Sequence, residues 1–146
     1  MKLYTGGTFD LFHWGHQNFL KKCKAISDEV VVSLNSDKFV FDYKLEHPRM
    51  TYAEREAALY NCKHVDRVIE NVGGSDSKPA ILNENPDIIA VGTDWVGKNY
   101  YKQMGFTEDW LEQNDIVLLY IPYTAYISSS TIKKYIDKNP DTLLYD

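Results

Sequence analysis

Short apolar runs alternate along this chain with segments that have the spacing of amphipathic helices, and this alternation constrains the fold most. The run at residues 30–34 (VVVSL) is nearly continuous, as in strands that are buried on both faces of a parallel sheet. We predict strands at residues 2–5, 29–35, 67–72, 87–91 and 115–121. The last two each contain at least four consecutive apolar residues, so we expect them to be buried as well.

Helix-like segments separate these strands, at residues 15–26, 51–62, 78–84, 107–114 and 129–138. Thr51 is a favourable N-cap and Glu54 completes a capping box, while Thr107 is the expected cap of a later helix. Strands separated by helices form right-handed βαβ units. The predicted fold class is therefore α/β, a Rossmann-like doubly wound parallel sheet of about five strands with helices on both faces.

The length of 146 residues suits one domain, residues 1–146, in which we expect the tail at 141–146 to be loosely ordered. A net charge of −5 argues against a nucleic-acid partner. No apolar stretch approaches the roughly 20 residues of a membrane helix, and the N-terminus lacks the apolar core of a signal peptide. Cys23 and Cys62 show no metal-binding spacing, and we expect them to be buried or half-buried residues of a reduced cytoplasmic protein.

The most informative segment follows the first predicted strand. Gly6 and Gly7 come directly after it, and His13 and His16 then stand three positions apart around Gly15. A glycine-rich turn between strand and helix lets backbone N–H groups approach a phosphate closely. The spacing of the histidines puts both imidazoles on one face of the first helical turn. The segment therefore predicts phosphate chemistry carried out without a protein nucleophile.

The stretch GTFDLFHWGH at residues 7–16 resembles the HxGH signature of the nucleotidyltransferase superfamily. Within it, the chain is most similar to the cytidylyltransferases, above all the glycerol-3-phosphate cytidylyltransferase family, over roughly residues 1–137. This resemblance implies that a phosphate oxygen attacks the α-phosphorus of a nucleoside triphosphate and that pyrophosphate leaves. It implies CTP as donor and a phosphorylated polyol, sugar or amino-alcohol as acceptor.

A phosphate monoester is already a nucleophile near neutral pH, so the implied reaction needs positioning and charge neutralisation and no general base. We predict that His16 contacts the α- and β-phosphate oxygens together with His13, although His13 is alternatively a residue that orients His16. Asp10 carries a charge that repels a triphosphate, so we expect it to cap the helix. The nucleotide-binding residues predicted in this turn are Gly6, Gly7, Thr8, Phe9 and Gly15.

Two further site residues follow in the next part of the chain. Lys44 lies in a predicted mobile loop at residues 42–49, where similar family members have lysines that reach the phosphates. We predict a catalytic role for Lys44, with a solvated surface lysine as the alternative. Arg55 matches the arginine of the family's helix motif, which stands near the active site and the dimer contact. We predict nucleotide binding for Arg55, with a residue on a wet helix face as the alternative.

The GTDW sequence at residues 92–95, with Lys98 after it, resembles the GDDWEGK segment of the glycerol-phosphate enzymes. The resemblance implies that Gly92, Asp94 and Trp95 bind the nucleotide, with Asp94 on a sugar hydroxyl or the base. Trp95 offers an aromatic face for stacking, and Lys98 is predicted to bind the acceptor phosphate. Residues 100–109 are not typical of the shortest relatives, and we expect them to form a lid or rim.

The ISSS sequence at the start of the last predicted helix resembles part of the family's RTEGISTT motif. Hydroxyls and free N–H groups at a helix N-terminus can hold β- and γ-phosphates, with an ordinary serine N-cap as the alternative. Tyr123 and Tyr126 replace the arginine and the glycine of this motif, which leaves the identity of the base open. The predicted nucleotide-binding residues here are Ile127, Ser128, Ser129 and Ser130.

The resemblance also implies partners. We expect Mg²⁺ to bind through the triphosphate oxygens with no metal-binding side chains, since Mg²⁺ keeps several waters and substrate phosphates in such sites. The family resemblance implies a homodimer. Two other functions stay open: an adenylyltransferase of the same fold that acts on a sugar phosphate or similar acceptor, and a nucleotide-binding module without catalysis.

Overall fold

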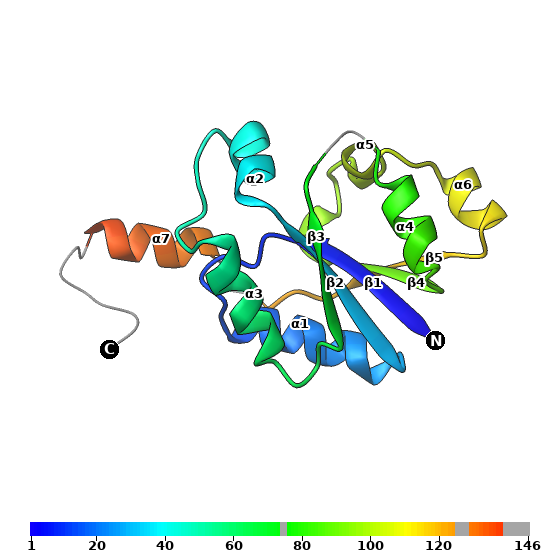
Figure 1. The fold of residues 1–146 in the computed structure, drawn as a ribbon, viewed down its shortest axis with the longest axis horizontal. Coiled ribbons are helices and arrows are strands. Elements are labelled where there is room, and N and C mark those ends of the chain that lie inside the picture. Colours follow the sequence, from blue (N-terminus) through cyan, green and yellow to red (C-terminus); the bar gives the residue numbers. More distant parts are fainter. Residues whose placement is uncertain (74–75, 125–128, 139–146) are drawn as a thin grey trace.

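A computed structural model of the chain describes residues 1–73, 76–124 and 129–138. Within these residues, five parallel strands form a sheet in the order β3-β2-β1-β4-β5 (Figure 1). The strands are β1 (Lys2–Gly7), β2 (Glu29–Asn35), β3 (Arg67–Asn71), β4 (Ile88–Gly92) and β5 (Val117–Ile121). This arrangement confirms the predicted doubly wound fold.

The strand order reverses between β1 and β4. From β1 the chain moves outward to β2 and β3, and it then returns to the other side of β1 to form β4 and β5. Ligands of open α/β sheets bind at the carboxyl ends of the strands, next to such a reversal. The ends of β1 at Gly7 and of β4 at Gly92 are therefore where a ligand site is expected.

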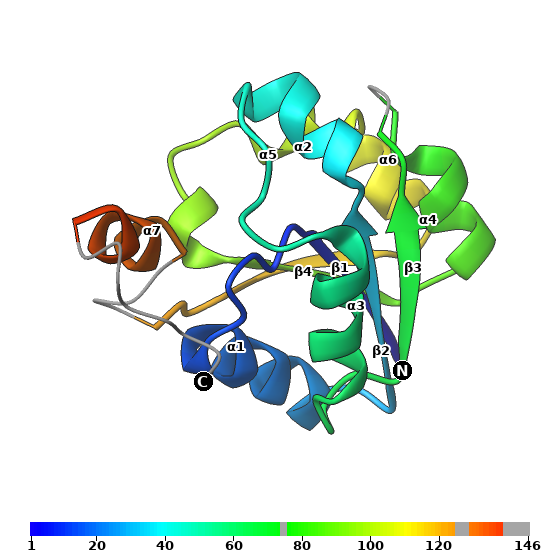
Figure 2. The ribbon, with the colours of Figure 1, turned by 60° about the vertical axis from the view of Figure 1, so that its left-hand side comes forward.

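Helices cover both faces of the sheet (Figures 1 and 2). One face carries α1 (Trp14–Ala25) and α3 (Tyr52–Tyr60), and the other carries α4 (Lys78–Glu84), α5 (Tyr100–Met104) and α6 (Glu108–Gln113). The remaining helical segments are α2 (Asp37–Lys44), the short 3-10 helix η1 (Thr93–Trp95) and α7 (Ser129–Lys138). None of the helices in the described part of the chain is long and apolar enough to cross a membrane.

Alternating residues of the strands supply two separate cores, because successive side chains of a strand point to opposite faces. Leu3 packs with Phe19 of α1 and Leu59 of α3. Its neighbour Tyr4 packs with Ile81 of α4 and Leu111 of α6. The expectation that both cysteines are buried is confirmed, and both are free thiols.

The prediction of a buried strand at residues 115–121 was wrong. β5 lies at the edge of the sheet, and its residues Val117 and Tyr120 are 54% and 40% exposed. β2, in contrast, is buried from Val30 to Asn35, as expected. An apolar run indicates that a strand packs against other parts of the protein. It does not show whether the strand has neighbouring strands on both sides or lies at the edge of the sheet.

Two helices replace segments that were predicted to be a loop and a lid. α2 begins after Ser36, whose side chain accepts a hydrogen bond from the N–H of Phe39, so the start of the predicted mobile loop is helical. Tyr100 and Phe106 are buried in the core between the sheet and α4–α6. Tyr100 and Phe106 thus anchor this segment in the core, since large aromatic side chains gain from burial, while Tyr100, Gln103 and Met104 line the cleft, as expected for a rim. The caps predicted at Thr51 and Thr107 are confirmed.

Candidate functional site

A cleft of about 630 Å³ opens at the carboxyl ends of the strands, where the sheet order reverses. It brings together many of the predicted site residues, which come from turns far apart in the chain. Those that line it are Gly6, Gly7, Thr8, Phe9, His16, Lys44, Gly92, Asp94, Trp95 and Lys98. Among the described residues, His13, Gly15 and Arg55 are predicted site residues that do not line it.

The two histidines form a capping box at the start of α1. His13 is the N-cap, and its Nδ1 accepts a hydrogen bond from the backbone N–H of Gly15 at 3.1 Å. The backbone N–H of His13 in turn donates to Nδ1 of His16 at 3.2 Å. A neutral imidazole whose Nδ1 accepts carries its proton on Nε2. Both histidines therefore present Nε2–H as a donor, and their rings stack with centroids 3.9 Å apart.

Burial keeps this pair uncharged. Desolvation, helped by the neighbouring His13, lowers the pKa of His16 to about 3, and desolvation also lowers the pKa of His13. The rings of Phe9 and Phe12 lie close to the ring of His16. Nε2 of His13 is buried without a hydrogen-bond partner within the described residues. An unpaired buried donor is costly, and such atoms in native structures typically belong to functional sites.

Asp10 has a different role from the predicted helix cap, since His13 occupies that position. The carboxylate of Asp10 is buried and accepts the backbone N–H groups of Arg49 at 2.8 Å and Met50 at 2.9 Å. It also pairs with Nζ of Lys133 at 2.9 Å. Burial alone would raise the pKa of Asp10, but these donors outweigh it and lower that pKa. Asp10 thus joins the turn after β1 to the segment before α3 and to α7.

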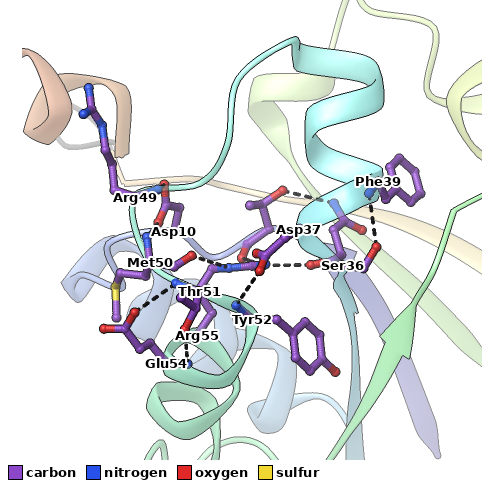
Figure 3. A network of polar contacts seen from close by, with 12 residues as sticks. Asp10, Ser36, Asp37, Phe39, Arg49, Met50, Thr51, Tyr52, Glu54 and Arg55 are labelled. Atoms are coloured by element: carbon purple, nitrogen blue, oxygen red, sulfur yellow. Dashed lines mark hydrogen bonds and ion pairs between the residues drawn. The ribbon is translucent and has the colours of Figure 1, made fainter.

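The side chain of Arg55 is fully buried and binds only protein atoms in the network that surrounds it (Figure 3). Its Nη1 donates to the carbonyl oxygens of Thr8 and Asn35, at 2.8 Å each. Its Nε donates to the carbonyl of Met50 at 3.2 Å, and its Nη2 pairs with Asp37 at 2.6 Å. Neither a nucleotide contact nor a wet helix face fits this position. Arg55 instead holds the turn after β1 against the end of β2.

Lysines occupy two separate rims of the cleft. Lys44 is the last residue of α2 and is exposed, rather than part of a loop as predicted. Lys98 follows η1, and its Nζ lies 5.5 Å from the ring centre of Trp95. Both lysines line the cleft, and their contact with phosphate groups stays a prediction.

The turn after β4 brings Tyr123 into the site. The backbone N–H of Tyr123 donates to Oγ1 of Thr93 at 3.1 Å, and its ring meets the ring of His16 edge-on. A Cβ on Gly92 would clash with Oδ1 of Asp94 and lie 3.1 Å from Cδ2 of Tyr123. Burial, with a contribution from Asp94, raises the pKa of Tyr123 to about 12, so its hydroxyl is protonated at neutral pH. Sequence analysis noted Tyr123 only as a replacement, and the structure adds it to the lining.

Sequence analysis also missed Asn35, Tyr43 and Asn71, which line the cleft at the ends of β2 and β3. The available signal was an asparagine at or next to the end of two predicted strands, Asn35 at the end of 29–35 and Asn71 one residue before the end of 67–72, whereas nothing in the sequence pointed to Tyr43 of α2. Of the ISSS segment, Ser129 and Ser130 begin α7, whereas Ile127 and Ser128 lie outside the described residues. A phosphate site at this helix N-terminus stays a prediction.

Comparison with known proteins agrees with this geometry. A sequence profile described as cytidylyltransferase-like matches residues 4–135. The chain belongs to the cytidylyltransferase-like family. It is 34% identical over 135 residues to glycerol-3-phosphate cytidylyltransferase from Bacillus subtilis (strain 168), covering 92% of this chain and 96% of the relative.

Two other members broaden the comparison. The chain is 32% identical to the FAD synthase of Thermococcus sibiricus, covering 97% of this chain and 94% of that protein. The solved lipopolysaccharide core biosynthesis protein from Thermoplasma volcanium aligns with a TM-score of 0.65 and 26% identity, over 87% of this chain and 98% of that one. This cytidylyltransferase-like chain is therefore an enzyme of the nucleotidyltransferase type, and the family predicted from the HxGH segment is confirmed.

Proposed function

We propose that the protein transfers CMP from CTP to a small phosphorylated acceptor and releases pyrophosphate. A phosphate oxygen of the acceptor forms a bond to the α-phosphorus. The bond from the α-phosphorus to the oxygen that bridges to the β-phosphate breaks, and its electron pair leaves with pyrophosphate. The observation that carries the proposal is the pair of neutral Nε2–H donors at the start of α1, one of them on the cleft.

The histidines act in this proposal as fixed hydrogen-bond donors. His16, which lines the cleft, directs Nε2–H toward phosphate oxygens on which charge builds up as pyrophosphate leaves, and His13 stacks on its ring and holds it in place. Because the pKa of His16 is about 3, its imidazole accepts few protons at neutral pH and is not suited to act as a base. The reaction requires no general base, since the acceptor phosphate is already anionic. A preorganised donor of this kind typically contributes about 10²–10³-fold to kcat.

Positive charge comes from the rims of the cleft. We assign Lys44 and Lys98 to the triphosphate and the acceptor phosphate, because both line the cleft and both are exposed. No group of three or more His, Cys, Asp or Glu suitable for a metal occurs among the described residues. Triphosphate oxygens and water would therefore hold Mg²⁺, which is its usual mode in phosphoryl-transfer sites. Mg²⁺ would supply neutralisation of the phosphate charge.

CTP is the preferred donor in this proposal because a relative that covers nearly the whole chain is named glycerol-3-phosphate cytidylyltransferase. ATP is the competing donor, because FAD contains AMP and a relative of similar coverage is named FAD synthase. A homodimer, implied by the family resemblance, belongs to the same proposal and is tested by analytical ultracentrifugation.

The test is pyrophosphate release with Mg²⁺, with CTP or ATP and with a panel of phosphorylated polyols, sugars and amino-alcohols. We expect the fastest release with CTP and its loss in His16→Ala. His64→Ala serves as the matched control, since His64 lies outside the cleft lining. Faster pyrophosphate release with ATP than with CTP would overturn the choice of CTP as the nucleotide donor. No release with any pair would favour a binding module without catalysis.

A further inference from the structure

Beyond the histidines, the cleft extends toward the ends of β2 and β3, where a chain of polar contacts follows its wall. The backbone N–H of Gly73 donates to Oδ1 of Asn71 at 3.1 Å, and Nδ2 of Asn71 donates to Oδ1 of Asn35 at 3.1 Å. Nδ2 of Asn35 then donates to Oγ1 of Thr8 at 3.0 Å. Thr8 also shares a hydrogen bond of 3.2 Å with the hydroxyl of Tyr43. We call this region, lined by Ser33, Asn35, Tyr43, Asn71, Ser77 and Gln103, the second lobe.

The direction of this chain is fixed at one end. The backbone N–H of Gly73 can only donate, so the atom of Asn71 that it meets must be the amide oxygen. The amide nitrogen of Asn71 then donates to Asn35, and the amide nitrogen of Asn35 donates to Thr8. Each asparagine has a second N–H and a second oxygen lone pair beyond these contacts. The pair can therefore both donate to and accept from a ligand.

The two asparagines lie side by side because of the sheet register. Asn35 and Asn71 are direct partners in the pairing of β2 with β3. Both point to the face that carries α4 and α5, since Ile69, two residues before Asn71, packs in that core. The space beside the two asparagines is open at Gly6, which has no side chain. A Cβ built on Gly6 would have only the Ser33 carbonyl oxygen within 4 Å. The second lobe therefore has room for a ligand against two amides.

Two carboxylates line the cleft near the second lobe, but neither side chain is directed at it. Asp76 pairs with Nζ of Lys78 at 2.8 Å. Glu70 stands between Ile69 and Asn71 on β3, so its side chain points to the opposite face, where its register partner Leu34 packs. The rings of Phe39 and Tyr43 pack against each other edge to face, with centroids 5.1 Å apart. Nζ of Lys44 lies 5.6 Å from the ring centre of Tyr43, so a cation of the protein already stands against this ring and a second cation there would be repelled.

We infer that Asn35 and Asn71 bind hydroxyl groups of the acceptor, which is therefore a phosphorylated polyol or sugar and not a phosphorylated amino-alcohol. The inference rests on the proposed function and names the substrate class for the same site. A hydroxyl donates one hydrogen bond and accepts others, which matches the donor and acceptor that each amide has to spare. An ammonium group only donates, and it would leave the spare N–H groups unpaired. The contact to Thr8 connects this recognition to the turn that holds the triphosphate.

The experiment compares kcat/KM, with CTP and Mg²⁺, for glycerol 3-phosphate, a hexose phosphate, propyl phosphate and ethanolamine phosphate. We expect the hydroxylated acceptors to exceed propyl phosphate and ethanolamine phosphate by about 10²-fold or more, because a site built for hydroxyls rejects analogues that lack them. Asn35→Ala and Asn71→Ala are expected to remove most of that advantage. The loss is measured as the ratio of kcat/KM between glycerol 3-phosphate and propyl phosphate within each variant, so a general effect of the substitution on the rate cancels. Asn83→Ala, an exposed asparagine of α4, is the matched control.

Asn71→Asp guards against a general effect on folding. Aspartate can still accept the N–H of Gly73, but it cannot donate to Asn35, so we expect the same loss of discrimination with the melting temperature retained. Faster reaction of ethanolamine phosphate, or equal losses with all four acceptors, would overturn the inference while the proposed function stands. If no acceptor reacts, the proposed function fails. Calorimetric titration with glycerol 3-phosphate and propyl phosphate then decides the inference, and equal affinities would overturn it.

Discussion

The turn after β1 and the turn after β4 both border the cleft, but they are built in opposite ways. In the first turn Phe9, Asp10, Leu11 and both histidines are buried. In the second, Thr93, Asp94 and residues 96–98 are exposed. The histidines assigned to the chemistry are thus held rigidly, whereas the turn that carries Asp94 and Lys98 is exposed and can adapt to a ligand. Electrostatic catalysis gains from donors that need not move, and this burial provides them.

The first turn stores backbone strain that its surroundings must hold. Phe9 and Leu11 adopt positive φ values of 51° and 50°, which non-glycine residues rarely do. Arg55 binds the carbonyl of Thr8 just before these residues, and Asp10, which lies between them, is held through its carboxylate by the N–H of Arg49. Strained residues typically persist at functional sites where the surrounding structure over-determines them.

The most severe test of this contrast is removal of Arg55. Arg55→Ala leaves three carbonyl groups without their buried donor, while Asp37 is 40% exposed and keeps the N–H of Tyr52, so we expect the free energy of unfolding to fall by about 3 kcal/mol. Urea denaturation measures the change. Arg49→Ala, which removes an exposed ion pair with Asp137, should cost no more than about 1 kcal/mol. Equal losses in the two variants would show that the first turn does not depend on its buried support.

Removal of one donor tests the assignment of the chemistry to the first turn. We expect His16→Ala to lower kcat by about 10²–10³-fold, with a small change in KM for CTP, because the lost contact acts mainly as charge builds up. Steady-state pyrophosphate release measures both constants. A large rise in KM with unchanged kcat would instead make His16 a ground-state binding residue.

The burial of His16 predicts how stability responds to acid. Its pKa is about 3 in the folded protein and 6.5 in the unfolded chain, so the unfolded chain binds more protons between these values. The contribution of neutral His16 to the free energy of unfolding is complete above pH 6.5 and is lost as the pH falls toward 3. We expect the free energy of unfolding to fall on the order of 2 kcal/mol over this range, and to fall less in His16→Asn. Urea titrations from pH 7 to pH 4 test this, and identical pH dependence in both proteins would contradict a neutral buried His16.

The smallest expected effect concerns the second turn. A Cβ in Gly92→Ala would displace the carboxylate of Asp94, and because that carboxylate is the end of an exposed, flexible side chain we expect the fold to tolerate the change. KM for the nucleotide should rise by up to about tenfold, equivalent to about 1.4 kcal/mol, with kcat nearly unchanged. Val96→Ala is the control, since Val96 belongs to the same turn, is 65% exposed and does not line the cleft. A larger fall in kcat for Gly92→Ala than for His16→Ala would reverse the comparison.

Several features of the site followed from local sequence. The glycine turn and the spacing of His13 and His16 are encoded within one short segment, so their placement on the first turn of a helix could be predicted. Features that depend on distant partners could not. Arg55 lies on a helix whose sequence gives no sign that its guanidinium reaches the carbonyls of Thr8 and Asn35. The pairing of Asn35 with Asn71 required the register of two strands.

The sequence by itself determined the alternation of strands and helices, the parallel sheet and the histidine turn, because hydrophobic period, capping and i, i+3 spacing act over a few residues. Only the tertiary structure decided which strands are central and which cations face the cleft. It also decided which ring nitrogen of each histidine carries the proton. These properties depend on burial and on hydrogen bonds between residues that meet only when the sheet has assembled.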